Sequence, residues 1–580
     1  MTLRSRLMIA TALSGLATLA HAEDMRFAPV PFPADDAARR AVVTTGSVTM
    51  NGQTAAIGFS TLARSGDKFG DHIFAQLLDQ DDKPLTTADT GATVSSAIDF
   101  TSLLQIGAKV FSLTQVEELP AAVYLSELAQ AADGKLSVIS TKPVDLSKVG
   151  GLWWPCAGSV TPWDTHLGSE EYPTDARAHE AAKSLDDIDE EVRPMARYFG
   201  LDDKTMSLDD YRAKLNPYRY GFPVEFSVTE AGDVSVVKHG AMGRFSVELA
   251  TILPDRKTAY MSDDGTNVGL YRFVADKAGD LTTGVLYAAK WVQTADQDGG
   301  AADIEWVDLG HGDDAAVLDA INKGTKFSDI FDTADFNADG SCPEGFLSSN
   351  ADGQAECLKL KPGMATIASR LETRRYASML GATTEFRKME GNVFSPDRNS
   401  LYVAMSEVSK GMTDADEKAD KGGRNDIRLA KNPCGAVYEL MLDEGFVGTR
   451  MAAVVAGIPV EYPADSPYAG NACDVDGIAN PDNVTYIPGQ NTLIIAEDTD
   501  NHQNDAIWSM NLTSGALTRI ATTPYGAEAT SVDWYPNLGG HGYLLAVVQH
   551  PFAETDSEQM KDPAEANAYL GYIGPFPVTP

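Results

Sequence analysis

Cysteine and histidine are scarce in this chain, which has 5 cysteines and 9 histidines among 580 residues. The histidines are scattered without the paired spacing of a zinc site, which argues against a histidine-rich metal centre. Three catalytic signatures are also missing from the sequence: the Gly-x-Ser-x-Gly elbow, the Gly-Lys-Ser/Thr phosphate loop and the His-Glu-x-x-His helix. Any metal in this protein should therefore be held mainly by carboxylates and by cysteine sulfur.

Positive charge is also in short supply. The chain has 46 lysines and arginines against 83 aspartates and glutamates, which gives a formal net charge of −37. This balance argues against nucleic acid or an anionic membrane as the main partner. Most of the acidic residues should be solvated surface, but carboxylates that pack close together need a cation, and Ca²⁺ binds such oxygens readily.

Long hydrophobic runs are confined to the N-terminus. Arg4 and Arg6 precede an apolar run from Leu7 to Ala20, which ends in a small-x-small pattern at Ala22. The alternative of a membrane anchor is disfavoured because about fourteen apolar residues fall short of the roughly 20 that span a bilayer. We therefore predict a secretory leader over residues 1–22 and a periplasmic or secreted mature chain. The two arginines are not adjacent, which favours export of the unfolded chain.

An oxidising compartment makes disulfides possible. Cys342 and Cys357 are close in sequence, and Cys434 and Cys473 would form a second pair. Four cysteines allow three connectivities, and sequence proximity favours this one. Cys156 is then left unpaired, and the simplest interpretation of a lone cysteine is a small buried hydrophobic residue.

A short pattern recurs along the chain: a strand, a turn of Pro, Asp or Gly, and a second strand. Each copy predicts an antiparallel hairpin that cannot bury both of its faces alone. Radial repetition of such units in a six-bladed β-propeller would solve that problem, and a β-sandwich is the alternative. Acidic or polar residues at the ends of the repeated strands favour the all-β propeller, whose strand ends converge on an axial site. The copies span residues 247–264, 391–407, 481–498 and 530–548.

No Ser- or Pro-rich linker divides the mature chain, so we expect residues 23–580 to form a single propeller domain. One segment differs from the hairpin pattern. Around residues 175–215 the sequence is rich in Ala, Glu, Asp, Lys and Arg, with apolar residues at roughly helical spacing. It predicts a helical insertion of one or two surface helices, interrupted near Pro194.

Cys156 heads a Gly- and Pro-rich turn, and the adjacent carboxylates of Glu170 and Glu171 follow it. A thiolate is a soft ligand and a carboxylate a hard one, so together they could hold a metal such as iron. Further acids lie among small or apolar neighbours rather than on an obviously solvated face. A single acid of this kind is usually salt-bridged, but several on equivalent strand ends would be brought together by a propeller. These acids are Glu248, Glu390, Glu497 and Glu528.

Arg387 and Lys388 precede Glu390 at the start of one repeat. In an acidic protein, a cation beside a metal cluster is what an anionic substrate would need. Arginine binds phosphate through two parallel hydrogen bonds, and lysine binds it as a point charge. Charge balance for the neighbouring carboxylates is an equally good interpretation.

Together these segments resemble one family, the secreted PhoX-type alkaline phosphatases, which are six-bladed propellers. The resemblance runs in order through most of residues 150–555 and so is more specific than any single motif. It rests on Pro155-Cys156-Ala-Gly, Thr161-Pro-Trp163, Glu170-Glu171, Tyr220-Gly-Phe-Pro-Val-Glu225, Gly243-Arg-Phe-Ser-Val-Glu248, Asp264-Gly-Thr, Tyr271-Arg-Phe, residues 386–391, Pro481-Asp-Asn483 and Gln549-His-Pro551.

The resemblance implies a cluster of Fe³⁺ and Ca²⁺ ions held by a cysteine and several glutamates. By position, Cys156 and Glu171 match iron ligands, and Glu248 and Glu390 lie beside them. Glu497 and Glu528 match ligands on the calcium side. Two departures stand out: Lys388 occupies the place of the family's phosphate-contacting arginine, and Val247 replaces a common histidine.

We therefore expect a metal-dependent phosphatase that acts on small phosphorylated substrates, phosphate monoesters first and diesters as a variant. Arg387 and Lys388 are its candidate catalytic residues. We expect no nucleic acid or membrane partner, and a monomer. The alternative is a calcium-binding periplasmic propeller with weak or no catalysis that serves as an interaction module, which the changes at Val247 and Lys388 keep open.

Overall fold

The computed structural model describes residues 25–87 and 91–578, so the predicted leader over residues 1–22 lies outside the described part of the chain. Six groups of four antiparallel strands, which we call blades 1 to 6, follow one another along the sequence, and blades 3 and 4 are joined in one nine-stranded sheet. Blade 1 contains β10 (Ile98–Ile106), β11 (Lys109–Val116), β12 (Ala122–Gln130) and β13 (Leu136–Pro143). Blade 2 contains β14 (Ser159–Val160), β15 (His166–Gly168), β16 (Val224–Val228) and β17 (Val234–Lys238). Blade 3 contains β18 (Val247–Ile252), β19 (Thr258–Asp263), β21 (Tyr271–Lys277) and β22 (Asp280–Ala295).

The second half of the chain forms the other three blades. Blade 4 contains β28 (Met389–Ser395), β29 (Ser400–Met405), β30 (Ala436–Leu442) and β31 (Gly448–Ala456). Blade 5 contains β32 (Pro481–Ile487), β33 (Thr492–Glu497), β34 (Ala506–Asn511) and β35 (Leu517–Thr522). Blade 6 contains β36 (Glu528–Thr530), β37 (Trp534–Leu538), β38 (His541–Gln549) and β39 (Tyr569–Pro577). A long strand, β23 (Ala301–Asp313), extends blade 3 and pairs with β31 of blade 4.

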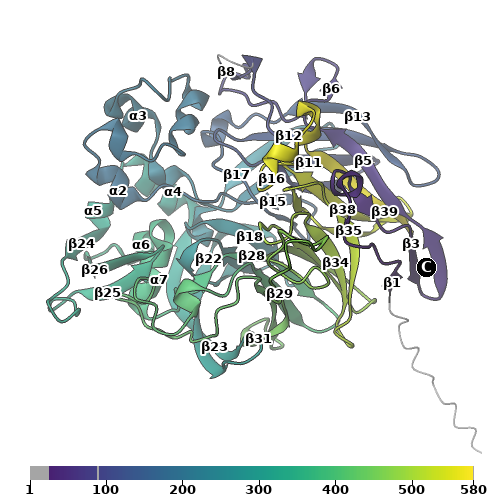
Figure 1. Cartoon of the computed structure of the whole chain (residues 1–580). Helices are drawn as coiled ribbons and strands as arrows, with labels where there is room; N and C mark the ends of the chain where they lie inside the picture. Colours follow the sequence, from purple (N-terminus) through teal and green to yellow (C-terminus); the bar gives the residue numbers. More distant parts are fainter. Residues whose placement is uncertain (1–24, 88–90, 579–580) are drawn as a thin grey trace, which may run out of the picture.

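The first strands of the blades lie around a common axis. β10 contacts β15 and β38, β14 contacts β18, β18 contacts β28, β28 contacts β32, and β32 contacts β36. The blades therefore close into a ring, which Figure 1 shows as a gradual change of colour around the molecule. This arrangement confirms the predicted all-β, six-bladed propeller and rules out the β-sandwich.

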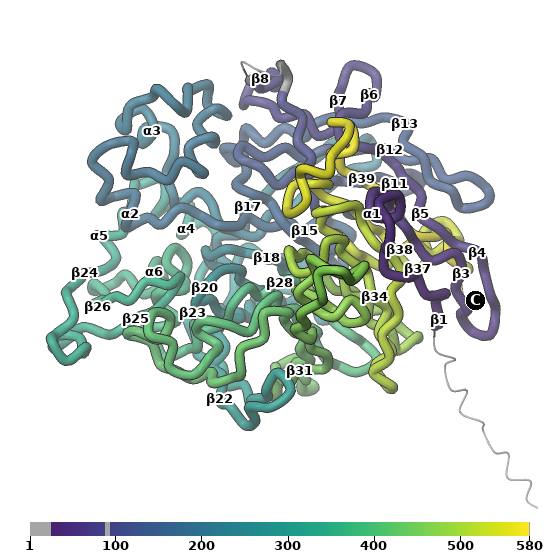
Figure 2. Tube along the Cα trace, in the orientation of Figure 1, coloured from purple at the N-terminus to yellow at the C-terminus, as the bar shows by residue number. Residues whose placement is uncertain are grey.

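Strands from opposite ends of the chain complete two blades. β5 (Gly58–Arg64) pairs antiparallel with β39 as the outer strand of blade 6. β2 (Val43–Thr44) pairs with β35 at the edge of blade 5. In Figure 2 the purple N-terminal trace accordingly runs beside the yellow C-terminal trace. Backbone hydrogen bonds between the two ends of the chain thus close the propeller.

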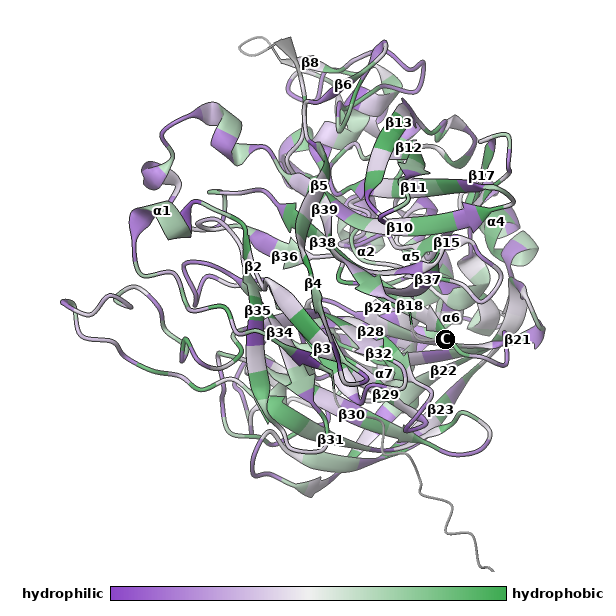
Figure 3. Ribbon diagram, turned by 90° about the vertical axis from the view of Figure 1, so that its right-hand side faces the viewer, coloured by the Kyte–Doolittle hydropathy of each residue, from purple (hydrophilic) through white to green (hydrophobic). Residues whose placement is uncertain are grey.

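Burial explains why these segments are strands. Every residue of β19, β29, β32 and β33 is buried. A strand covered on both faces carries a nearly continuous apolar sequence rather than an alternating one. Figure 3 shows hydrophobic residues along many of the blade strands. The hydrophobic clusters lie between neighbouring blades; Tyr402, Val437, Tyr486 and Trp508, for example, join blades 4 and 5.

Excursions from the blades carry most of the helices, which gather on one side of the molecule in Figure 1. Within residues 25–87 and 91–578, no helix is long and apolar enough to cross a bilayer. The α-helices are α1 (Asp36–Arg39), α2 (Ala176–Ala181), α3 (Leu208–Lys214), α4 (Asp314–Asn322), α5 (Phe327–Ile330), α6 (Ala365–Leu371) and α7 (Thr373–Leu380). Between α2 and α3 lie two 3₁₀ helices, η2 (Leu185–Asp187) and η3 (Arg193–Phe199), and Pro194 stands in the first turn of η3.

Short elements complete the chain outside the blades. Three strands form a small sheet at the N-terminus: β1 (Arg26–Phe27), β3 (Ser47–Met50) and β4 (Gln53–Ala56). Three more form a sheet beside α7: β24 (Phe331–Ala334), β25 (Leu347–Ala351) and β26 (Gln354–Leu360). The two-stranded pairs are β6 (Lys68–Phe69) with β7 (His72–Ile73), β8 (Thr86–Thr87) with β9 (Gly91–Ala92), and β20 (Thr266–Val268) with β27 (Phe386–Arg387).

Further 3₁₀ helices are η1 (Ser147–Val149), η4 (Pro217–Arg219), η5 (Gly240–Met242), η6 (Lys410–Met412), η7 (Ser557–Gln559) and η8 (Pro563–Ala566).

Both predicted disulfides are present. Cys342 bonds to Cys357 within an excursion, and Cys434 bonds to Cys473 between blades 4 and 5. Cys156 is left as a free thiol.

Candidate metal centre

Acidic residues begin the inner strands of five blades, and Cys156 stands just before the inner strand of the sixth. Because the inner strands line the axis, their first residues meet at one end of it. We call this set the axial ring. It contains Asp99 of β10, Cys156 before β14, Glu248 of β18, Glu390 of β28, Asp482 of β32 and Glu528 of β36.

A β-bulge places the acid in four of the blades. In blade 3, Val247 pairs with Asp263 and Ala250 pairs with Met261, so two residues of β18 face one residue of β19. Glu248 is the first of the two. Blades 1, 4 and 5 repeat this register shift at the same point. A bulge bends the strand and redirects a side chain. Here it accompanies an acid in every case: Asp99, Glu248, Glu390 and Asp482.

Five of the six ring residues, all but Glu528, belong to groups whose potential ligand atoms lie close together. Three groups each offer ligand atoms that all lie within 4.8 Å of one another. The Cys156 sulfur lies 3.6 Å from Glu248 Oε1 and belongs to two of the groups. The groups are Asp99 with Glu117 and Cys156, Cys156 with Glu171 and Glu248, and Glu248 with Glu390 and Asp482.

A second layer of side chains comes from the other strand of each hairpin. Because that strand runs antiparallel to the first, its last residues return to the same end of the axis. Glu117 follows β11, and Glu171 lies three residues beyond β15. Asp264 follows β19, and its carboxylate accepts a hydrogen bond from the Tyr172 hydroxyl. His550 follows β38, with its Nε2 3.4 Å from Glu528.

Burial and mutual repulsion raise the pKa values of the carboxyl groups in the axial ring. Burial raises the pKa of Glu248 well above its usual range, and the charges of Glu171 and Glu390 raise it further. Burial, together with nearby carboxylates, also raises the pKa of Glu171, Asp482 and Glu528 well above the usual range. A cation bound among these carboxylates would offset the repulsion and lower their pKa values again.

The ring also strongly disfavours a bare thiolate. Burial and the charge of Glu248 raise the pKa of the Cys156 thiol well above its usual range. One carboxylate oxygen, Oδ2 of Asp99, is buried without a hydrogen-bond partner among the described residues. A buried acceptor without a hydrogen-bond donor lowers the free energy of unfolding. One soft sulfur and several hard carboxylate oxygens are a donor set that suits metal ions.

Lys388 is the cation of the ring. Its ammonium lies 3.6 Å from Glu390 Oε1. Burial alone would lower its pKa, but the surrounding carboxylates, Glu390 and Asp264 foremost, raise it well above the usual range. Arg387 points elsewhere: its guanidinium bonds to Glu407 at 3.2 Å and to Thr266 at 3.0 Å. The structure therefore separates the two adjacent cations.

The residues predicted from sequence fall into two sets. Cys156, Glu171, Glu248 and Glu390 come together in the ligand groups described above. Glu528 lies outside these groups, and its charge helps to raise the pKa of Asp482.

Glu497 lies in a different network. Its oxygens accept hydrogen bonds from Trp508 Nε1 at 2.7 Å, from the Ala479 and Ala506 amides at 2.8 Å each, and from the ring of His502 at 3.0 Å. Every lone pair of this carboxylate has a protein donor.

Glu170 and Glu171 are adjacent but also have different surroundings. Glu170 is fully buried and bonds to Lys238 Nζ at 2.7 Å and to the Trp153 and Gly221 amides. It thereby holds blade 2 together, whereas Glu171 faces the axial ring. Val247, the departure beside Glu248, packs in an apolar cluster of blade 3 and contributes no polar atom to the ring.

Sequence reasoning did not single out Asp99, Glu117 or Asp482. One signal could have found Asp482. Glu248, Glu390 and Asp482 each stand six positions before a turn proline, namely Pro254, Pro396 and Pro488. Asp99 and Glu117 lack this signal because the first hairpin turns at Gly107 without a proline.

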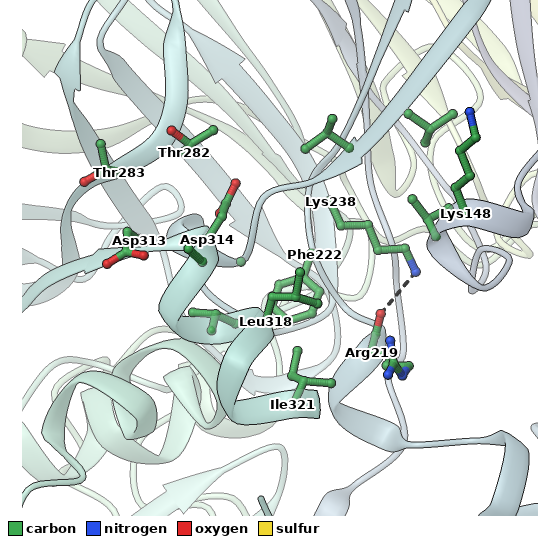
Figure 4. Close-up of a pocket in the computed structure, with 16 residues that line it drawn as sticks. Lys148, Arg219, Phe222, Lys238, Thr282, Thr283, Asp313, Asp314, Leu318 and Ile321 are labelled. Atoms are coloured by element: carbon green, nitrogen blue, oxygen red, sulfur yellow. Dashed lines mark hydrogen bonds between the residues drawn. The ribbon is translucent and has the colours of Figure 1, made fainter. Parts of the chain in front are cut away.

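Two cavities lie near this end of the fold. One, of about 570 Å³, borders the ring through Glu117 and Tyr172. The other, of about 700 Å³, opens between β17, η4 and α4 and has no axial-ring residue in its described lining. Figure 4 shows it with Lys238 bonded to the Arg219 carbonyl on one side and Asp313 and Asp314 on the other.

Three solved structures show what this chain is similar to. The structure of Pseudomonas fluorescens PhoX in complex with vanadate, a transition state analogue, is 16% identical over 95% of this chain and 98% of that chain, with a TM-score of 0.59. A putative 6-phosphogluconolactonase from Bacteroides uniformis is 12% identical over 78% and 92% of the two chains, with a TM-score of 0.29. The periplasmic gluconolactonase of Pseudomonas aeruginosa is 10% identical over 81% and 96%, with a TM-score of 0.30.

Among curated proteins, none matches this chain in sequence. The sequence profile described as "Alkaline phosphatase PhoX" matches residues 121–551, a span that includes four of the five acids of the axial ring and Cys156. The chain therefore belongs to the alkaline phosphatase PhoX family, a family of phosphoric ester hydrolases.

Proposed function

We propose that this protein hydrolyses phosphate monoesters at a cluster of Fe³⁺ and Ca²⁺ ions held by the axial ring. The observation that carries the proposal is the convergence of donors from all six blades on one buried point, with Lys388 as their cation. Membership of a phosphatase family sets aside the alternative of a non-catalytic calcium-binding propeller.

The ligands of the axial ring fall into two groups, one that contains sulfur and one that offers only carboxylate oxygens. Cys156, with Glu171 and Glu248 beside it, would hold iron, because sulfur is the one soft donor of the ring. Glu390, Asp482 and Glu528 would hold calcium, which takes carboxylate oxygens in flexible numbers. Glu497, which we predicted as a calcium ligand, has all its oxygens engaged by protein donors, so we assign it a supporting role instead.

When bound, such ions supply Lewis-acid polarisation of a phosphoryl group. The chain itself supplies the complementary charge. The Lys388 ammonium lies beside Glu390 in a partly buried position, where an electrostatic interaction is stronger than in bulk water. It is placed to offset negative charge that develops on the phosphoryl oxygens during transfer.

The central test uses residues 23–580, supplied with Fe³⁺ and Ca²⁺ and assayed for p-nitrophenyl phosphate hydrolysis before and after calcium chelation. We expect chelation to lower activity by about tenfold or more, and added Ca²⁺ to restore it. A fully metallated protein that hydrolyses nothing would refute the proposal. Bis(p-nitrophenyl) phosphate in a parallel assay measures any diesterase activity.

Iron assignment has its own test. Cys156→Ser should lose iron, measured by mass spectrometry of the purified protein, because the hard hydroxyl replaces the soft sulfur. Ser169→Ala is the matched control, since Ser169 is buried nearby and bonds to the Ala157 carbonyl rather than to the ring. Equal iron content in both variants would rule out Cys156 as a ligand.

We also propose export, which the predicted leader and the two disulfides support. Activity and protein should then appear in the periplasmic or culture fraction. A monomer in solution stays a prediction, to be checked by light scattering.

A further inference from the structure

A cavity of about 570 Å³ lies between the axial ring and the 175–215 excursion, and we call it the side pocket. Glu117 belongs both to its lining and to the ligand group of Asp99 and Cys156. Tyr172, also in the lining, directly follows Glu171 and donates its hydroxyl to Asp264. The side pocket therefore begins where a phosphoryl group held at the ring would carry its ester substituent. Its volume suits a small organic group.

Two aromatic side chains form one wall of the side pocket. The rings of Trp154 and Tyr172 meet edge to face, with centroids 6.1 Å apart and an interplanar angle of 81°. Both residues have positive φ values, 34° and 41°, which non-glycine residues rarely adopt. Trp153 Nε1 donates to the Tyr172 carbonyl at 3.0 Å and helps to hold that conformation. Strained backbone beside Cys156 and Glu171 is typical of a functional site.

The charged side chains that line the side pocket are all carboxylates. No lysine or arginine is among its described lining residues, whose titratable groups are Tyr172, His179 and five carboxylates. His179 adds no positive charge near neutral pH, because burial and the charge of Arg212 lower its pKa to about 4. The carboxylates are those of Glu117, Asp175, Asp187, Asp189 and Glu191.

The arginines around the side pocket are engaged by protein groups. Arg177 pairs with Glu356, whereas Arg193 and Arg212 donate to the backbone carbonyls of the lining residues Ile188 and His179. Among the carboxylates, Asp175 pairs with Arg375, and Asp187 and Asp189 accept from backbone amides. Glu191 is exposed and has no side-chain partner among the described residues. Its charge is therefore free to meet a ligand.

An aromatic wall and an excess of carboxylates favour a cation and repel an anion. We propose that the side pocket selects phosphate monoesters whose alcohol carries a quaternary or protonated amine, with Trp154, Tyr172 and Glu191 as specificity-determining residues. This inference rests on the proposed function and names its substrate class. Lys388 at the phosphate end and carboxylates at the alcohol end would orient such a substrate.

The test compares two esters of the same shape. Choline phosphate and 3,3-dimethylbutyl phosphate differ in having a quaternary nitrogen or a carbon at one position. We expect kcat/KM to be about 5-fold or more higher for choline phosphate. Glu191→Gln and Trp154→Leu should each move this ratio towards one. Glu190→Gln is the matched control, because Glu190 is the exposed neighbour that pairs with Arg193 outside the described lining, and it should leave the ratio unchanged.

Equal kcat/KM for the two esters in the unmodified protein would overturn the inference while leaving the phosphatase proposal intact. If neither ester nor p-nitrophenyl phosphate is hydrolysed, the proposed function fails, and the side pocket is tested by calorimetric titration with choline and 3,3-dimethylbutanol. Tighter binding of choline that Glu191→Gln weakens and Glu190→Gln does not would support the side pocket. Equal binding of the two alcohols would overturn it.

Discussion

Lys388 and Arg387 are adjacent in the sequence, yet their side chains meet different environments. The Lys388 ammonium is held among carboxylates of the axial ring, 3.6 Å from Glu390. The Arg387 guanidinium bonds to Glu407 and to β20. Lys388 has a positive φ of 45°, and this backbone conformation directs its side chain away from that of Arg387. The sequence alone could not distinguish them, because alternation along a strand depends on the backbone conformation at each residue.

This difference predicts unequal effects of matched substitutions. Lys388→Met should lower kcat/KM for p-nitrophenyl phosphate by about 100-fold or more, because a charge directed at the reacting group is lost. Arg387→Met should lower it by less than about 5-fold, and Lys388→Arg should recover part of the activity. Steady-state kinetics with metal content measured in each variant checks this. Equal losses at both positions would contradict the assignment.

Glu497 and Glu528 offer a second contrast between side chains of one type. Glu497 is saturated by Trp508, His502 and two backbone amides. Glu528 has no comparable set of donors and lies 3.4 Å from His550. A saturated carboxylate stabilises the fold, whereas an unsaturated one is available to a metal.

We therefore expect opposite phenotypes. Glu528→Gln should weaken calcium binding by about tenfold or more with a small change in melting temperature. Glu497→Gln should keep its calcium content but unfold at a lower temperature, since breaking a buried network costs roughly 1–3 kcal/mol. Calcium titration by calorimetry and thermal unfolding measure the two effects separately. Loss of calcium in Glu497→Gln alone would reverse our assignment.

The hairpins explain how much of the architecture was predictable. The repeated pattern of a strand, a turn of Pro, Asp or Gly and a second strand predicted the hairpins β18–β19, β28–β29 and β32–β33. The bulges were not predicted, because a register shift depends on how two strands pair, and strand spacing alone does not show this. The acids of blade 1 were missed because its first hairpin has no turn proline, and the pairing of β5 with β39 was missed because it joins segments from opposite ends of the chain. Both disulfides were predicted correctly from sequence proximity.

A histidine joins β16, β17 and α4. His239 is buried, with Nε2 2.9 Å from Glu225 and Nδ1 3.2 Å from Asp314. Both ring nitrogens must donate to make these bonds, so the folded protein holds the imidazolium. Burial opposes that charge, but hydrogen bonds to the two carboxylates raise the pKa of His239 from 6.5 to about 9.

This raised pKa predicts how stability depends on pH. The contribution of His239, on the order of 3 kcal/mol, is fully present below pH 6.5 and is lost as the pH rises through 9. His239→Gln should therefore cost much more stability at pH 6 than at pH 10 in urea unfolding. His311→Gln is the control, because that histidine pairs with Asp276 on the surface. A pH-independent difference between wild type and His239→Gln would show that the ion pair is not the cause.

The propeller as an assembly concentrates repulsion at its centre. Six blades converge on buried acids, and Lys388 is the only lysine or arginine that the described ion pairs place beside an axial-ring residue. Bound cations would relieve this repulsion, and a ligand that binds only the folded state stabilises it. Metal and stability should therefore be coupled in this protein.

Removal of calcium by chelation should lower the melting temperature by about 5 °C or more, and added Ca²⁺ should restore it. Differential scanning calorimetry measures the change. In Glu528→Gln the same treatment should have a smaller effect, because one donor is already missing. An identical melting temperature with and without calcium would show that the ring is stable without cations.

Pairing of β5 with β39 has a consequence for the order of events in the cell. Blade 6, which contributes Glu528 to the axial ring, gains its outer strand only when residues 58–64 meet residues 569–577. A chain whose last residues are not yet available cannot complete blade 6 and does not present the full set of donors. Loading of the metals should therefore be a late step, and C-terminally shortened products should remain poorly metallated.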